Sequence, residues 1–154
     1  MTKLFPLIIF CLFANHGDAN ENKTLKSLIE NRSCNGCNLS KLNLGLHNLQ
    51  RVNLSGADLS ESYLVNVDLS NANLSSSDLS NTYMNGANLS DATLVKTNLS
   101  GAELELADFS QALFVDVNLV DAYLLHASIS EEQLNNARLC NTVLPDASTS
   151  NRDC

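Results

Sequence analysis

The sequence is poor in aromatic residues. It has no tryptophan, and Phe, Trp and Tyr together make up 5% of its 154 residues. Because the hydrophobic content is nevertheless 44%, the core has to be built mainly from leucine and alanine. Beyond the N-terminal segment there is no apolar run of the roughly 20 residues that a transmembrane helix needs. A chain of this length is sufficient for one domain with a modest core.

Positive charge is also scarce. Nine Lys and Arg residues stand against 17 Asp and Glu residues, which gives a formal net charge of −8. Phosphate backbones and anionic lipid surfaces are bound through lysine and arginine, so a chain of this charge is a poor partner for either. We expect no nucleic-acid partner, and the simplest use of the charge is solubility.

Sequence motifs typical of catalysis are missing. There is no Gly-rich phosphate loop, no HExxH motif and no pair of carboxylates set in an apolar stretch. His47 and His126 lie far apart in the sequence. Aspartate and serine are abundant, but they recur with the repeat described below, so a Ser-His-Asp combination drawn from them carries little information. The sequence predicts a protein that is not an enzyme and holds no cofactor.

The N-terminal segment, 1–19, has the layout of a secretory signal peptide. Lys3 gives a short positive start, residues 4–13 form an apolar run, and small residues precede a cleavage site after Ala19. We predict an exported protein, whether periplasmic, lumenal or secreted, that is not inserted in the membrane after cleavage. Its mature chain, 20–154, loses one Lys and one Asp and so keeps the charge of −8. The alternative is an uncleaved leader that anchors the chain.

The remaining sequence is dominated by a leucine at every fifth position, as in VNLSGADLSESYLVNVDLSNANLSSSDL (52–79). An amphipathic helix needs apolar residues three and four apart, and a half-buried strand needs them at every second position, so a spacing of five predicts neither. From Leu39 to Leu144 all 22 positions of this phase are apolar. The position two residues earlier is small, and from Val52 to Ala127 it holds only Ala, Ser, Thr or Val. Both positions are expected to face a narrow core.

The combined pattern, A(D/N)LXX, resembles that of the pentapeptide repeat family over residues 37–144. The resemblance implies an all-β solenoid, a right-handed quadrilateral β-helix in which four consecutive pentapeptides form the four sides of a square coil. In such a coil the leucine and the small residue before it would point inward, and a larger residue at the small position would overpack the core at a cost of about 1–3 kcal/mol. The repeats would make a rod of roughly 25 Å at the spacing of paired strands.

The N-terminal end of such a rod needs a cover, because each coil buries its face only against its neighbours. Residues 20–36 are predicted to form this cap. They include a short amphipathic helix in which Leu25, Leu28 and Ile29 lie at helical spacing and pack over the open core.

The C-terminal end allows two predictions. Residues 130–133, SEEQ, have the form of a capping box and favour a helical turn. Leu134 and Leu139 keep the five-residue phase and favour a continued coil. Residues 130–138 are therefore left open between helix and coil, and residues 145–154 are expected to be a C-terminal tail.

Four cysteines remain outside the leader, and an even number in an exported chain indicates two disulfides. The resemblance extends to exported and lumenal family members with cysteine pairs at their ends, which implies the pairs Cys34–Cys37 and Cys140–Cys154. One zinc site would need all four sulfurs at about 2.3 Å from one ion, which the two ends of a rod cannot provide. We expect no metal site, and closure of the longer loop should contribute about 3 kcal/mol in the chain-entropy model.

If residues 20 apart stack, outward side chains form columns along the rod. Two faces are expected to expose apolar residues: Tyr63, Tyr83, Tyr123, Leu106 and Leu125 on one, and Val95, Leu113 and Val115 on the next face but one. We predict these residues as a candidate surface for a protein partner or for self-association. The alternative is that they stack on one another as ordinary solvated surface.

The predicted function is that of an exported, non-catalytic structural or interaction module that presents a rigid solenoid face to an unidentified protein. The resemblance implies one alternative, since some family members are acidic rods that mimic DNA and occupy topoisomerases, which protects these enzymes from quinolones. The leader and the dilution of carboxylates by Asn and Ser argue against this alternative.

Overall fold

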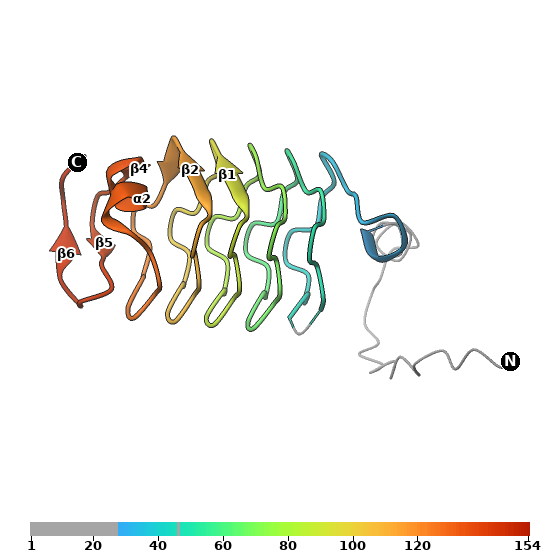
Figure 1. Cartoon of the computed structure of the whole chain (residues 1–154), viewed down its shortest axis with the longest axis horizontal. Coiled ribbons are helices and arrows are strands. Elements are labelled where there is room, and N and C mark those ends of the chain that lie inside the picture. The colour runs from blue at the N-terminus through green and yellow to red at the C-terminus, as the bar shows by residue number, and fades with distance from the viewer. Residues whose placement is uncertain (1–27, 46) are drawn as a thin grey trace, which may run out of the picture.

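The computed structural model describes residues 28–45 and 47–154. Over these residues the chain forms a rod of coils stacked side by side, with a helical turn at the N-terminal end and a short helix at the C-terminal end (Figure 1). The predicted signal peptide, 1–19, and the first part of the predicted cap, including Leu25, lie outside the described residues.

Backbone pairing links residues that are 20 positions apart. Parallel bridges join Tyr63 to Tyr83 and Tyr83 to Glu103, and the same offset recurs at every fifth residue along most of the chain. Each coil therefore consists of four sides, and each side is one pentapeptide. The N–H groups of core residues supply many of the bonds between coils; that of Leu59, for example, donates to the carbonyl of Asp78 at 2.7 Å.

The strands are few and short, although the pairing runs along the rod. They are β1 (Thr93–Val95), β2 (Leu113–Val115), β3 (Val117–Asn118), β4 (Ala137–Arg138), β5 (Thr142–Val143) and β6 (Thr149–Ser150). Pairing is parallel for β1–β2 and β3–β4 and antiparallel for β5–β6. Corners interrupt the ladders, because a residue with left-handed φ, such as Asn71 at 59°, recurs at every fifth position. Most sides therefore contribute one bridging residue.

The two predicted inward positions fill the core. Leu59, Leu79 and Leu99 are completely buried, and Ala57 and Ala72 at the small position are 1% exposed. At the C-terminal end the packing loosens, since three residues of the leucine phase are only partly buried: Ile129, Leu134 and Leu144. The tight interior explains why the second inward position holds small residues over most of the repeat.

Hydroxyl groups at the small position are accommodated by core carbonyls. The Ser77 hydroxyl donates to the carbonyl of Leu74 at 2.7 Å, and the Thr97 hydroxyl of the next coil donates to the same carbonyl at 2.8 Å. Ser62 differs, because its buried hydroxyl has no hydrogen-bond partner among the described residues. A buried serine is thus tolerated where its hydroxyl donates a hydrogen bond to a carbonyl, and Ser62 lacks such a bond.

The N-terminal end carries part of the predicted cap. Residues 28–31 are helical, and Leu28 is completely buried against the core, as predicted. Ile29 was also predicted to pack over the core, but it is 46% exposed. The prediction for Ile29 is therefore wrong: consecutive helical residues point about 100° apart, and of these two only Leu28 is directed into the core.

At the C-terminal end, helix α2 (Glu131–Asn135) replaces one side of a coil. It starts with a complete capping box between Ser130 and Gln133, and the coil then resumes, because β4 pairs with β3 in the same 20-residue register. Both patterns seen in residues 130–138 are therefore present. The helix accounts for the capping box, and Ala137 and Leu139 return to the core behind it.

The C-terminal segment, 145–154, does more than form a tail. It folds back so that β6 pairs with β5, and the N–H of Asp153 donates to the carbonyl of Leu139 at 2.8 Å. Cys140 and Cys154 form a disulfide with their Cα atoms 4.9 Å apart, and Cys34 and Cys37 form one at the other end with 5.4 Å between Cα atoms. Each end of the repeat therefore carries a disulfide bond.

Candidate interaction surfaces

One side of the solenoid, here called the tyrosine wall, is built by residues 43–45, 63–66, 83–86, 103–106, 123–126 and 143–146. The rings of Tyr63 and Tyr83 stack on it with centroids 4.7 Å apart and planes 12° from parallel. The 20-residue register brings these rings together, because it places the two residues opposite one another in adjacent coils. The two tyrosines are 50% and 37% exposed.

Exposed apolar side chains gather on this wall. Of eight large hydrophobic residues exposed among the described residues, five belong to it: Tyr63, Val65, Tyr83, Leu106 and Tyr123. Leu106 is the most exposed of them, at 63%. The exposure of Leu106 was predicted, whereas the predicted surface lacked Val65 and included Leu125, which is half-buried.

The other predicted surface residues lie on a separate side, the β1–β2 wall, built by residues 33–36, 53–56, 73–76, 93–96 and 113–116. Leu113 and Val115 are exposed there, whereas Val95 is half-buried. Since each coil has four sides and these two are not consecutive, they face opposite ways. The predicted residues therefore lie on two separate surfaces, as expected from the repeat, and cannot contact one small partner surface together.

The tyrosine wall carries negative charge only. Its carboxylates are those of Glu103, Glu105 and Asp146, and none of its described residues is a lysine or arginine. Lys41 lies at the adjoining corner, where its ammonium group is 3.7 Å from the carboxylate of Glu61. Apolar exposure and negative charge thus occur on the same wall.

Many of the Asp and Asn residues that precede a core leucine are engaged with the backbone. The Asp58 carboxylate accepts the N–H of Ser60 at 3.0 Å, and an Asn at the same phase, such as Asn73, accepts in the same way from Ser75 at 3.1 Å. Both residue types supply the same acceptor oxygen, which explains their interchange in the repeat. These side chains stabilise corners and are not free surface groups.

The hydrogen bonds at these corners also affect the pKa of the carboxyl groups, as Asp68 illustrates. Partial burial raises its pKa, but hydrogen bonds from the N–H and hydroxyl of Ser70 and from the Gln50 amide outweigh this effect and lower the pKa below the ordinary value. The carboxylate is therefore held in its charged form by the corner that it stabilises.

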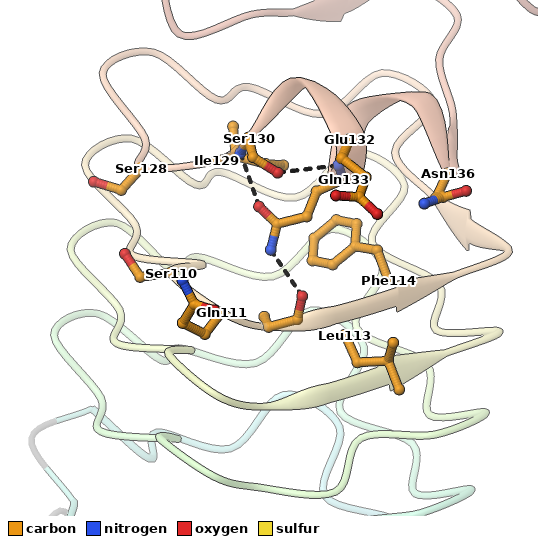
Figure 2. Close-up of a pocket in the computed structure, with 11 residues that line it drawn as sticks. Ser110, Gln111, Leu113, Phe114, Ser128, Ile129, Ser130, Glu132, Gln133 and Asn136 are labelled. Carbon is orange, nitrogen blue, oxygen red and sulfur yellow. Dashed lines mark hydrogen bonds between the residues drawn. The ribbon is translucent and has the colours of Figure 1, made fainter.

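A groove lies beside α2, where the helix replaces the coil side that would pair with β2 (Figure 2). The Gln133 side chain reaches across it, and its Nε2 donates to the carbonyls of Phe109 at 2.7 Å and Ala112 at 2.8 Å. Its Oε1 accepts the N–H of Ser130 at 2.8 Å. Figure 2 shows this amide above β2, with the Phe114 ring beside it. Gln133 thereby supplies hydrogen bonds where the regular coil side is interrupted.

The remaining residues considered from the sequence do not converge. His47 is half-buried near the N-terminal end, where its Nδ1 is 3.1 Å from the carbonyl oxygen of Gly45, and His126 is exposed. Within residues 28–45 and 47–154 no group of three or more His, Cys, Asp or Glu side chains could hold a metal ion. No helix among these residues is long and apolar enough to cross a membrane.

Comparison with known proteins identifies the architecture. The family model for pentapeptide repeats matches residues 33–71, 72–111 and 102–139, with eight copies. This chain belongs to the pentapeptide repeat family. Curated protein sequences give no match.

Solved structures of other pentapeptide repeat proteins agree with this assignment. The chain is similar to Rfr23 from the cyanobacterium Cyanothece 51142, with 30% identity, a TM-score of 0.69, and coverage of 71% of this chain and 88% of that one. It is also similar to QnrB1, a plasmid-mediated fluoroquinolone resistance protein, with 14% identity, a TM-score of 0.53, and coverage of 62% and 54%. The first likeness implies a right-handed quadrilateral β-helix for this pentapeptide repeat protein, and the second concerns the fold alone.

Proposed function

We propose that this pentapeptide repeat protein is an exported, non-catalytic module that binds another protein through its tyrosine wall. The observation that carries the proposal is the concentration of exposed apolar side chains on that one wall, where five of the eight large exposed ones among the described residues lie. Such patches are typical of protein interaction sites when polar groups surround them. The stacked coils hold the side chains at fixed spacing, so little conformational entropy would be lost on binding.

Export is supported by the ends of the chain. Residues 1–19 have the composition of a signal peptide, and both disulfides would persist in an oxidising compartment. Cell fractionation followed by N-terminal sequencing tests this part. We expect a chain that starts at Asn20 outside the cytoplasm, and an intact Met1 in the cytoplasmic fraction would contradict it.

Interaction is tested by photo-crosslinking in living cells, with the photoreactive residue placed at Tyr83 on the tyrosine wall or at Ser80 on the neighbouring side. We expect a discrete protein adduct from position 83 and none from position 80. Adducts of equal yield from both positions, or from position 80 alone, would show that the tyrosine wall is not the contact surface.

The DNA-mimic alternative has a separate test. Corner carboxylates such as those of Asp58 and Asp78 accept backbone N–H groups, so fewer of their lone pairs are free to imitate phosphate oxygens. We expect no inhibition of DNA gyrase supercoiling by the purified protein. Inhibition at micromolar concentration would favour the alternative over the exported module.

A further inference from the structure

We propose that the tyrosine wall recognises a basic polypeptide segment, in which a lysine or arginine side chain is held by Glu103 between the rings of Tyr83 and Tyr123. The inference rests on the proposed function, because it specifies the chemistry of the partner that this wall would bind. Three features carry it: the order of residues in one column, the charge of the wall and the apolar side chains beside the column.

The column places a carboxylate between two aromatic residues. Tyr83 pairs with Glu103, and Glu103 pairs with Tyr123, so the three are successive neighbours in adjacent coils. Paired strands lie about 4.8 Å apart, which brings each ring close to a cation bound at the carboxylate. A cation within about 6 Å of a ring centroid is attracted by the π face.

The Tyr83 ring is oriented for this contact. One of its faces is stacked on Tyr63, with the planes 12° from parallel, so its other face is directed along the column toward Glu103. The Glu103 carboxylate is oriented as well, since its Oε2 accepts a hydrogen bond from Asn85 at 3.1 Å. The lone pairs that this bond leaves unused can accept from an incoming ammonium or guanidinium group.

Charge selects a basic partner over an acidic one. Glu105 and Asp146 add to the negative potential of the wall, and the nearby cation, Lys41, is already engaged by Glu61. An acidic peptide or a nucleic acid would be repelled by this arrangement. The exposed side chains of Val65 and Leu106 border the column and suit the aliphatic stem of a lysine or arginine or an adjacent apolar residue.

The test measures binding of a fluorescein-labelled dodecapeptide in which arginine alternates with leucine, by fluorescence anisotropy on the purified, oxidised protein. The control probe replaces each arginine with citrulline, which keeps the shape and removes the charge. We expect the arginine peptide to bind at least tenfold more tightly than the citrulline peptide, and we expect this preference to weaken with salt.

Variants then locate the site. Glu103→Gln keeps the acceptor for Asn85 and removes one charge, and it should weaken binding of the arginine peptide about threefold to tenfold. Asp91→Asn removes one charge at an exposed corner outside the tyrosine wall and should change the affinity for the arginine peptide less than about twofold. Tyr83→Leu and Tyr123→Leu keep apolar bulk without the π face and should each weaken binding about threefold. Circular dichroism checks that each variant is folded.

Several outcomes would overturn the inference. Equal losses in Glu103→Gln and Asp91→Asn would show unspecific attraction to an acidic protein, and equal binding of the two peptides would exclude recognition of charge. A dimer in sedimentation velocity that Tyr83→Leu dissociates would make a second copy the partner. If position 83 crosslinks a protein in cells while the peptides bind equally, the proposed function stands and the basic partner is wrong; if position 83 crosslinks nothing, the proposed function itself fails.

Discussion

Replacing Gln133 tests how the rod is closed at its C-terminal end. Gln133 is 9% exposed, and its amide makes three hydrogen bonds: two to the carbonyls of Phe109 and Ala112 and one from the N–H of Ser130. In Gln133→Leu the side chain keeps its bulk but can make none of them. The Phe109 carbonyl still accepts the Ala112 N–H at 3.0 Å, so it is not left without a donor.

The expected cost follows from these bonds. A typical hydrogen bond contributes about 0.5–1.5 kcal/mol net, and a buried group left unpaired costs about 1–3 kcal/mol, so Gln133→Leu should lower the free energy of unfolding by about 2–4 kcal/mol. Urea denaturation of the oxidised protein measures it, with the exposed neighbour substitution Glu132→Gln as the matched control, expected within about 0.5 kcal/mol of the parent. A loss below about 0.5 kcal/mol in Gln133→Leu would refute the reasoning.

The variant Gln133→Glu adds a pH-dependent check on the same geometry. A carboxylate there would face two carbonyl oxygens, which would raise its folded-state pKa above the unfolded value. Its stability contribution is therefore present at low pH and lost as pH rises through the folded pKa. We expect the midpoint of urea unfolding, relative to that of the parent protein, to be higher at pH 4 than at pH 8, and a pH-independent difference would contradict the assigned bonds.

Other perturbations have similarly defined outcomes. Gly86→Ala should lower the free energy of unfolding by about 1–2 kcal/mol, because φ is 68° at this corner and a Cβ would meet the Asn66 side chain of the adjacent coil. An unchanged urea midpoint would contradict the left-handed backbone conformation assigned to Gly86. Ser62→Ala should leave the stability unchanged or raise it, because it removes a buried hydroxyl without a partner among the described residues. Ser77→Ala should lower the free energy of unfolding by about 1 kcal/mol, because it removes the hydrogen bond to the Leu74 carbonyl. Thermal melts in which Ser62→Ala is the less stable of the two variants would contradict these hydrogen-bond assignments. Hydrogen bonds from Arg152 hold the pKa of Asp153 below its ordinary value in the folded protein. The charged carboxylate therefore stabilises the fold at pH values above the pKa of the unfolded state, and this contribution is lost as pH falls through the pKa of the folded state. The melting temperature below about pH 4 should therefore fall less in Asp153→Asn than in the parent protein, and identical acid profiles would show that this contact is unimportant.

The regular part of the fold could be predicted from the sequence because one physical requirement repeats along it. Leucine at every fifth residue and a small residue two positions earlier are demanded by the narrow interior, and Leu59, Leu79 and Leu99 are indeed completely buried. The 20-residue stacking that follows also predicted that Tyr63 and Tyr83 would be neighbours, and their rings stack.

The ends were harder to predict, because their structure depends on single contacts and not on a repeated one. The capping box at Ser130 indicated α2 correctly, but nothing in the pattern showed that Gln133 would reach back to the carbonyls of the preceding coil. The C-terminal residues 145–154 have no repeat, so their return as β6 had no periodic signal. Ile29 shows the same limit, since one helical turn offers too few residues to fix which side is buried.

The candidate surface was predicted in outline only. Columns of residues 20 apart identified Tyr63, Tyr83 and Tyr123, but exposure also depends on where a residue lies within its pentapeptide. Leu106 is far more exposed than Leu125, because it occupies a left-handed corner with φ 59°, whereas Leu125 lies one position before the corner at His126.

The stacking of residues 20 apart underlies every wall assigned to this protein, and spin-label distances measure it most directly. Labels at Ser40 paired with Ser100 or with Val120 span three and four coils on one side of the rod. At about 4.8 Å per coil, we expect backbone separations of about 14 Å and about 19 Å, rising by one coil spacing from the first pair to the second. A rise of about 30 Å between the two pairs, as along a helix, or no constant step would contradict the account.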